Sequence, residues 1–331
     1  MIPLSLLDLS PISAGSNAGA SLRNSLDLAQ HAESWGFHRY WLAEHHGMPG
    51  IASAATAVLI AHIAAGTSTL RLGAGGIMLP NHSPLIIAEQ FGTLDALHPG
   101  RIDLGVGRAP GTDPSTSRAL RRHSISQAEH FPQDVAELIG YFKANSSGQH
   151  VRAIPGTGQN VPVWILGSSL FGAQLAAHMG LPYVFASHFA PGQLMEAIEV
   201  YRKQFKPSAS LSKPYVMLGI SIFAADSDTE AELLASSWQQ VFVNLFSGTP
   251  SQLPPPVANY MNELPAIQKA MLHDVLACTL VGTGDNIRQQ VDDFVSRTGA
   301  DELMISTQIY DHQARLHSYE IVAKTLIGRK G

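Results

Sequence analysis

The chain has 331 residues, of which 45% are hydrophobic and only 14% are charged, a composition that excludes a disordered protein. With a formal net charge of −5 it lacks the positive field that nucleic-acid or anionic-membrane binding needs. Its one cysteine, Cys278, can form no intrachain disulfide, which excludes a secreted disulfide scaffold and a zinc site built on paired cysteines.

Residues 1–10 contain no Lys or Arg and no cleavage-like pattern of small residues, so we predict no signal peptide. The longest apolar stretch, 51–65, is interrupted by His62 and is shorter than the ~20 residues that a membrane span requires. We therefore expect a soluble, cytoplasmic protein.

Short apolar runs alternate with longer amphipathic stretches along the whole chain. The runs predict strands at 3–9, 39–43, 70–75, 102–106, 161–166, 183–187, 215–224 and 302–306. The stretches predict helices at 22–35, 51–65, 85–97, 134–143, 173–179, 194–205, 229–245, 286–297 and 313–326. Strands that each precede a helix indicate βαβ units. The number of predicted strands favours a closed (β/α)8 TIM barrel. The chain length alone would also suit two domains. We predict an α/β fold with one barrel domain over residues 1–331.

Two segments do not fit this repeat and are predicted as loop insertions, at about 109–131 and about 247–264. The first contains a cluster of basic side chains and follows the fourth strand. Because active sites of β/α barrels lie on the face where the strands end, we expect this insertion on that face. The second contains consecutive prolines, Pro254 to Pro256, and precedes the last βα unit.

The second predicted strand leads into Glu44, His45 and His46, which would point from the strand end toward a substrate. An imidazole suits proton transfer near neutral pH. Because adjacent strand residues face opposite ways, only one of the two histidines should reach the pocket. The histidines could instead only form structural hydrogen bonds at the strand end. They could also bind a metal together with other histidines of the chain, namely His82, His98 or His188. Their contiguous spacing does not match a metal-binding helix, and we assign no metal ligand.

Glycines and an arginine follow the third and fourth strands. Gly75 and Gly76 would let a flat ligand approach the backbone, although a strand bulge would need them equally. Arg108 stands at a strand end, where a guanidinium can bind phosphate or carboxylate, or form a salt bridge with a neighbouring loop. The run from Gly105 to Gly111 lacks the third glycine and the later acidic residue of a dinucleotide-binding loop.

After the fifth strand, Gly167, Ser168, Ser169 and Gly172 run directly into a predicted helix. Backbone N–H groups at a helix N-terminus, with serine hydroxyls beside them, can bind a phosphate. Ordinary N-capping would explain one of the two serines. A barrel mouth with an imidazole, a glycine-lined wall, an arginine and such a loop suits a phosphorylated planar cofactor.

These residues belong to longer stretches that resemble the luciferase-like flavin-dependent monooxygenases, a (β/α)8-barrel family that includes bacterial luciferase. Within that family the chain is most similar to the YhbW-type oxidoreductases. The resemblance covers nearly the whole chain, and the stretches that carry it are 7–11, 39–46, 73–111, 166–169, 186–189 and 311–317.

The resemblance implies an FMN-dependent, two-component monooxygenase that oxygenates a small organic substrate with O2. Reduced FMN would come from a separate NAD(P)H-dependent flavin reductase. His45 would act as the catalytic acid or base, with Glu44 and His46 as orienting groups. The family commonly pairs through helices beside the second and third strands, so a homodimer is expected; the stretch 51–65 could supply its face or belong to the core.

The resemblance also implies the cofactor contacts. The peptide between Gly75 and Gly76 matches the position of a cis bond that packs against the flavin ring. Arg108 and the loop with Ser168 and Ser169 match phosphate-binding positions.

The chain departs from the family pattern at two positions. Gly107 stands where luciferase has a reactive cysteine, so no thiol chemistry is expected there. Gly172 stands where some relatives have a hydroxyl residue, which leaves phosphate binding to backbone amides and the two serines. Three alternatives stay open: F420-dependent hydride transfer on the same fold, a non-catalytic flavin-binding protein, and a metal-dependent hydrolase.

Overall fold

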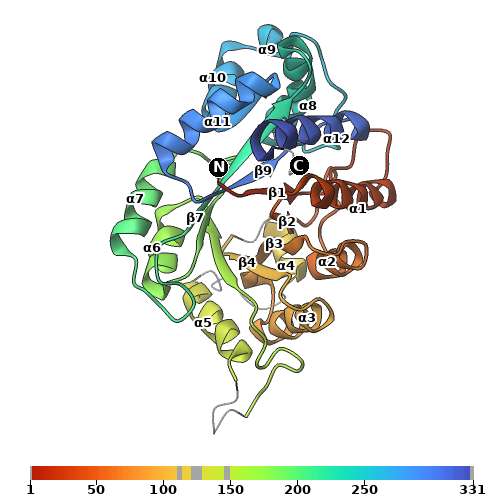
Figure 1. Cartoon of the computed structure of the whole chain (residues 1–331). Coiled ribbons are helices and arrows are strands. Elements are labelled where there is room, and N and C mark those ends of the chain that lie inside the picture. Colours follow the sequence, from red (N-terminus) through yellow and green to blue (C-terminus); the bar gives the residue numbers. More distant parts are fainter. Residues whose placement is uncertain (1, 110–113, 121–128, 145–149, 329–331) are drawn as a thin grey trace.

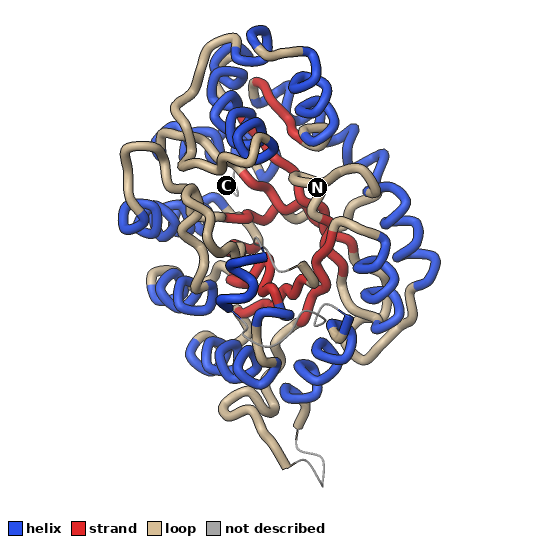
Figure 2. The backbone as a smooth tube through the Cα atoms, turned by 180° about the vertical axis from the view of Figure 1, so that it is seen from behind, coloured by secondary structure: helices blue, strands red, loops and turns tan. Residues whose placement is uncertain are grey.

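The strand pairings among the described residues are all parallel, as alternating strands and helices predict. The computed structural model describes residues 2–109, 114–120, 129–144 and 150–328. Its strands are β1 (Leu4–Asp8), β2 (Arg39–Leu42), β3 (Arg71–Met78), β4 (Ile102–Gly107), β5 (Val163–Gly167), β6 (Tyr183–Phe185), β7 (Val216–Ala224), β8 (Thr279–Gly282) and β9 (Glu302–Ser306). β1 to β7 and β9 form a ring that the pairing of β6 with β7 closes (Figure 2), which confirms the predicted (β/α)8 barrel.

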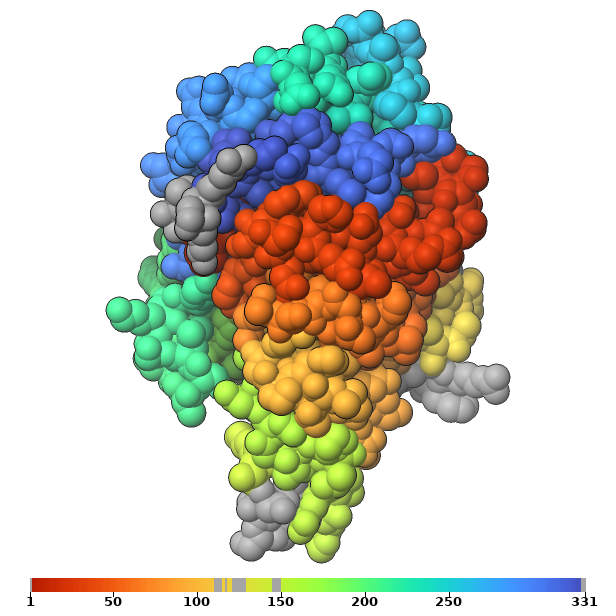
Figure 3. Space-filling view, turned by 45° about the vertical axis from the view of Figure 1, so that its right-hand side comes forward, coloured from red at the N-terminus to blue at the C-terminus, as the bar shows by residue number. Residues whose placement is uncertain are grey.

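Helices cover the outside of this ring (Figure 1). They are α1 (Ala18–Trp35), α2 (Thr56–Ala65), α3 (Pro84–Leu97), α4 (Pro114–Leu120), α5 (Phe131–Phe142), α6 (Leu170–Met179), α7 (Leu194–Gln204), α8 (Asp228–Phe246), α9 (Tyr260–Glu263), α10 (Ala266–Val275), α11 (Gly284–Thr298) and α12 (His312–Val322), with the short turns η1 (Leu79–Asn81) and η3 (Ala323–Ile327). α1 and α12 pack side by side (Figure 3), so the first and last helices complete the outer layer. No helix within the described ranges has the length and apolar character that crossing a membrane requires.

The helix α1 shows how the local sequence sets these boundaries. The side chain of Asn17 accepts a hydrogen bond from the Ala20 N–H and caps the start of the helix. Gly36, with a φ of 87°, adopts the left-handed conformation that ends it. Leu28 and Ala32, one turn apart, are fully buried against the barrel.

In the N-terminal half of the chain, the structure differs from the prediction in two segments. The helix expected at 51–65 begins only at Thr56, because the backbone before it pairs with the loop after β1: Ile51 bridges Pro11, and the Ala52 N–H donates to the Ser10 carbonyl at 3.0 Å. The insertion expected at about 109–131 contains α4, while 110–113 and 121–128 lie outside the described residues.

The connection between β7 and β9 contains elements that the sequence did not predict. α10 and β8 both lie between the predicted helices that correspond to α8 and α11. β8 pairs with residues 221–224 of β7, beyond the part of β7 that pairs with β6. It has only four residues, two of them half-buried, so its apolar pattern is too short to indicate a strand.

The interior of the barrel is filled by side chains from alternate strand positions. Near the strand starts, Arg39 lies between Asp103 and Glu302, with N–O distances of 2.6 and 3.0 Å. Above this ion network, a buried cluster that includes Trp41 and Met217 closes the centre of the ring. The barrel interior is therefore closed by packed side chains, and a ligand would bind above them, at the mouth where the strands end.

Candidate active site

The segment after β2 carries the predicted catalytic residues into the mouth of the barrel. Trp41 and Ala43 belong to the buried interior cluster, so the odd-numbered positions face inward, and His45 continues this series. Glu44 and His46 lie together on the other side, with the His46 ring against the Glu44 carboxylate. The two histidines are thus separated, as the alternation along a strand predicts.

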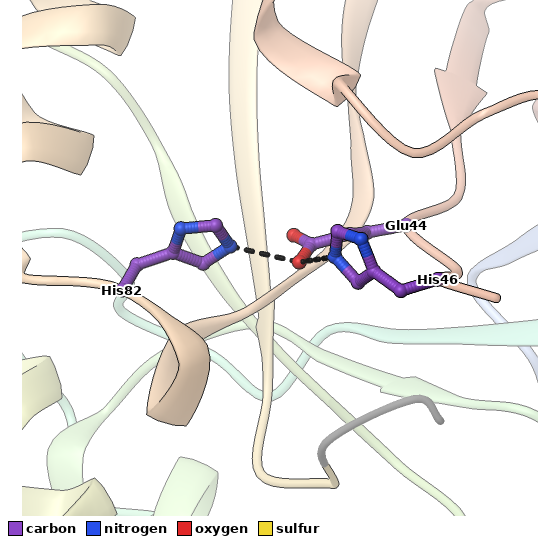
Figure 4. Close-up of side chains that lie close together, drawn as sticks. All are labelled: Glu44, His46 and His82. Atoms are coloured by element: carbon purple, nitrogen blue, oxygen red, sulfur yellow. Dashed lines mark hydrogen bonds and ion pairs between the residues drawn. The ribbon is translucent and has the colours of Figure 1, made fainter. Parts of the chain in front are cut away.

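Glu44 joins His46 and His82 in one hydrogen-bonded cluster (Figure 4). Its Oε1 atom accepts hydrogen bonds from Nε2 of His46 at 2.7 Å and from Nε2 of His82 at 2.8 Å. Its Oε2 atom accepts from the Met78 N–H at 3.1 Å. Burial by itself raises the pKa of Glu44, but these hydrogen bonds outweigh it and bring the pKa below its ordinary value. The ionised carboxylate ties the end of β2 to the end of β3.

The same three side chains are of the types that bind divalent metals. One ligand atom from each of Glu44, His46 and His82 lies within 4.8 Å of the others. Direct hydrogen bonds between them account for this convergence. The sequence indicated His82 only as one of several histidines that could join a metal site, because it follows a different strand and belongs to no local motif with Glu44. The assignment of no metal ligand stays a prediction.

His45 has a different environment from its two neighbours. Its backbone N–H donates to the Ser53 carbonyl at 3.0 Å, which holds the loop in place. The ring atom Nδ1 is buried and has no hydrogen-bond partner within the described chain. Burial lowers the pKa of His45, and the nearby Glu44 carboxylate opposes that shift. The ring is therefore neutral at neutral pH, and an unpaired buried nitrogen marks a place where a ligand would bind.

A second imidazole, His188, lies at the mouth on the side of β6. Its Nδ1 atom is also buried without a partner among the described residues. Burial, with a smaller contribution from His45, lowers the pKa of His188 to about 4. The two rings interact although β2 and β6 stand on opposite sides of the ring of strands. The sequence indicated His188 only as part of a family-like stretch and as a possible further metal ligand, and it was not assigned as a site residue.

The peptide bond between Gly75 and Gly76 is cis, as the family resemblance implies. It lies in β3 where the pairing with β4 changes register. A Cβ on Gly75 would lie 2.7 Å from Cδ1 of Leu7, and one on Gly76 would lie 2.8 Å from the Gly105 carbonyl oxygen. The strand irregularity and this close packing account for the two glycines, and contact with a flavin ring stays a prediction.

Arg108 lies at the end of β4, exposed at the mouth. Its guanidinium carbon lies 4.1 Å from the centroid of the Phe171 ring, in the first turn of α6. The alternative of a salt bridge finds no partner in the described parts of the chain, where Arg108 forms no ion pair. The guanidinium is therefore placed beside the N-terminus of α6, as a phosphate site requires.

The loop before α6 brings the remaining predicted cofactor residues to the same place. Ser168 is exposed, and Ser169 is the N-cap residue of α6 but makes no capping hydrogen bond with its side chain. Gly167 and Gly172 pack together, since a Cβ on Gly172 would lie 3.6 Å from the Gly167 Cα. Capping does not account for the serines, so this loop fits an anion better than it fits a purely structural role.

The second insertion is attached to the loop that follows β1. The backbone of Leu253 donates to the Ile12 carbonyl at 2.9 Å and accepts from the Ala14 N–H at 2.8 Å. Leu253 is itself buried. These contacts anchor the segment after α8 to the loop after β1.

A parallel barrel that carries an ionised carboxylate, two neutral imidazoles and an exposed arginine at the ends of its strands belongs to the class of β/α-barrel enzymes. The family model for the luciferase-like monooxygenases matches residues 2–302. The chain belongs to the luciferase-like monooxygenase family, and it is an oxidoreductase of the monooxygenase type.

Relatives agree with this assignment over most of the chain. It is 55% identical over 330 residues to a luciferase-like monooxygenase of Escherichia coli strain K12, covering 99% of this chain and 98% of that protein. It is 37% identical over 255 residues to the N-acetyl-S-alkylcysteine monooxygenase of Bacillus subtilis strain 168, covering 75% of each.

Solved structures show the same fold. The apo-MsnO8 structure matches with a TM-score of 0.90 and 32% identity over 99% of both chains. The oxygenating constituent of a 3,6-diketocamphane monooxygenase from Pseudomonas putida, in complex with FMN, matches with a TM-score of 0.70 and 18% identity over 98% of this chain and 97% of that one. An F420-dependent secondary alcohol dehydrogenase matches with a TM-score of 0.70 and 14% identity over 99% of both chains. The last two identities establish a shared fold alone.

Proposed function

We propose that the protein is an FMN-dependent, two-component monooxygenase that uses reduced FMN and O2 to oxygenate a small organic substrate. The observation that carries this proposal is the buried, unpaired Nδ1 of His45 in a mouth whose anion-binding end is formed by Arg108 and Ser169. A flat polar ring with a phosphate tail could bind both: its ring near His45, and its phosphate near Arg108 and Ser169. Membership of a monooxygenase family supports the same conclusion.

Two groups of residues would hold FMN, and both fit it. The phosphate would bind where a guanidinium, uncapped serines and the first N–H groups of α6 come together, and the ring would lie against the cis peptide of β3. When bound, reduced FMN supplies the electrons that activate O2 for transfer of one oxygen atom to the substrate. The residues assigned are Gly75, Gly76, Arg108, Gly167, Ser168, Ser169 and Gly172.

The protein's own contribution is to orient the reactants and to move a proton. His45 is neutral at neutral pH because burial lowers its pKa, so the ring can accept a proton at Nδ1. Glu44 stays ionised and, through His46 and His82, holds the segment on which His45 lies. The segment around Leu253 limits the access of water to the mouth.

The reductant would come from a separate NAD(P)H:flavin reductase, because the chain carries no nicotinamide-binding fingerprint. The related Pseudomonas protein, described as an oxygenating constituent, is likewise one part of a larger system. For the substrate, the Bacillus relative points to thioethers, so S-alkylated N-acetylcysteines are the first compounds to assay.

The proposal is tested first by anaerobic titration of the apo protein with reduced FMN and with F420. Binding of F420 in place of FMN would favour hydride transfer.

Turnover is then followed with a reductase, NADH, O2 and the thioether panel. His45→Ala should lower the turnover rate by ~10²-fold or more, because it removes the proton-transfer group. His273→Ala, on α10 with its side chain 88% exposed, is the matched control. FMN binding without product across a broad panel would favour a flavin-binding protein, and full activity of His45→Ala would make His45 a structural residue.

The protein is further proposed to act as a homodimer. α2 and α3 pack against each other, and together they carry three exposed apolar side chains: Val58, Ile86 and Leu97, with exposed fractions of 72%, 50% and 65%. α2 also buries Leu59, Ile60 and Ile63, so the predicted segment is partly core and partly exposed face.

A further inference from the structure

The ring of His188 is held in a fixed place above Gly219 of β7. A Cβ on Gly219 would lie 2.3 Å from Nδ1 of the ring, so no residue other than glycine leaves it room. The preceding residue, Ser187, is fully buried and donates from its hydroxyl to the Gly219 carbonyl at 2.6 Å. On the other side, Phe189 stacks on Phe242 of α8 with the ring centroids 5.9 Å apart. The turn that carries His188 is therefore fixed from both sides.

The contact with Gly219 also indicates which nitrogen of His188 carries the proton. A Cβ added to Gly219 would lie 2.3 Å from Nδ1 of His188. It would lie farther from the two ring carbons bonded to that nitrogen, at 3.1 and 3.4 Å. Nδ1 is thus directed at the Gly219 backbone, where the described residues offer it no hydrogen-bond partner. An N–H enclosed there would be left unpaired, whereas a bare nitrogen can accept a weak contact from a Cα–H. The neutral ring therefore carries its proton on Nε2, at the opposite end.

The opposite end of the ring is less enclosed than Nδ1. The side chain of His188 is only half-buried although its Nδ1 is enclosed. His45 comes from β2 and His188 from the end of β6, on opposite sides of the barrel, and His45 makes a smaller contribution than burial to the lowered pKa of His188. A ligand in the mouth would thus lie between a proton-transfer group and a fixed N–H donor.

We propose that His188 is a second ligand-binding residue of this centre, whose Nε2–H donates a hydrogen bond to the pyrimidine edge of the bound flavin ring. This inference rests on the proposed function. That edge of a flavin carries carbonyl oxygens and ring nitrogens, which need donors once they leave water. An uncharged donor held in place by packing supplies such a bond without the cost of burying a charge and without reorganisation on binding.

The test is the affinity of the apo protein for reduced FMN, measured by anaerobic calorimetry. His188→Ala should weaken binding by ~10-fold or more, the equivalent of one buried hydrogen bond. His188→Gln, whose amide can donate in place of the ring, should bind within about threefold of the wild type. The control His273→Ala, at an exposed position of α10, should bind like the wild type. Wild-type affinity in His188→Ala, with wild-type protein that binds FMN, overturns this inference and leaves the proposed function intact. Failure of the wild-type protein to bind reduced FMN overturns both.

A second measurement covers the case in which the alanine variant does not fold. Nitrogen-15 NMR of histidine-labelled wild-type protein, assigned with His188→Gln, should show His188 protonated on Nε2 and should show that Nε2 signal shift when FMN is added. Protonation on Nδ1, or an Nε2 signal that FMN leaves unchanged, overturns the inference.

Discussion

Arg315 of α12 donates a hydrogen bond from Nη2 to Oδ1 of Asp8 at the end of β1, at 2.8 Å, and both side chains are almost completely buried. Burial by itself raises the pKa of Asp8, but Arg315 and the hydrogen bonds from Tyr40 and Ser25 bring it below its ordinary value. The pair joins the stretches 7–11 and 311–317, which both carry the family resemblance. These stretches are therefore neighbours that close the barrel.

Asp8→Asn should lower the free energy of unfolding by about 3–5 kcal/mol, because it leaves the Arg315 charge buried without a counter-ion. Urea denaturation measures this loss. Asp27→Asn is the matched control: Asp27 pairs with His312 at 2.8 Å but is 43% exposed, so its loss should cost under about 1 kcal/mol. Equal losses in the two variants would contradict a structural role for the buried pair.

Gly219→Ala should destabilise the protein and displace the His188 ring, because the new methyl group would lie 2.3 Å from Nδ1. We expect a loss of about 1–3 kcal/mol, the usual cost of overpacking a filled site. Gly107→Ala is the control, since its Cβ would meet only the Met78 sulfur, at an ordinary 3.5 Å. Thermal unfolding compares the two variants. A melting temperature for Gly219→Ala equal to that of Gly107→Ala would mean that the ring is not fixed where the structure has it.

The sequence predicted the fold well because the alternation of apolar runs and amphipathic stretches is a local signal that the barrel repeats. It also indicated the residues at the ends of β2 to β5, because a strand end is visible in the sequence. His82 and His188 had no such signal and could be named from the sequence only as possible further metal ligands. His82 joins the site only through Glu44, and His188 only through Gly219, so their roles depend on contacts between strands that are distant in the sequence. β8 was missed because four residues show no period.

The stability of the protein should fall as the pH is lowered from about 6.5 to about 4. His188 has a folded-state pKa of about 4 against an ordinary value of 6.5, so in this range the unfolded chain binds a proton that the folded chain does not. The contribution of His188 to the free energy of unfolding is present in full above pH 6.5 and is lost as the pH falls toward 4. This loss should amount to about 2–3 kcal/mol. Urea denaturation at several pH values should show a shallower pH dependence of stability for His188→Gln than for the wild-type protein.

Glu44→Gln should disconnect the end of β2 from His82 and lower both stability and turnover. A neutral amide is a weaker acceptor for two imidazole N–H groups, so we expect a loss of about 1–3 kcal/mol. The pKa of Glu44 is lowered in the folded state, so the contribution of Glu44 to stability is present above its ordinary pKa of 4.5 and is lost as the pH falls through the folded-state pKa.

Dialysis of the wild-type protein against EDTA should leave its melting temperature unchanged. A drop that zinc reverses would show instead that Glu44, His46 and His82 hold a metal.

Val58→Glu should convert the proposed dimer to a monomer. Val58 on α2 is 72% exposed, and Ile86 and Leu97 lie three helical turns apart on the adjacent α3, so the charge would enter the proposed contact face. Burying an unpaired carboxylate there is costly enough to prevent association at micromolar concentrations. Light scattering measures the mass of each variant. Ile267→Glu is the control, because Ile267 is 80% exposed on α10, within the connection between β7 and β9. A wild-type monomer, or dissociation by the control alone, would place the contact elsewhere or remove it.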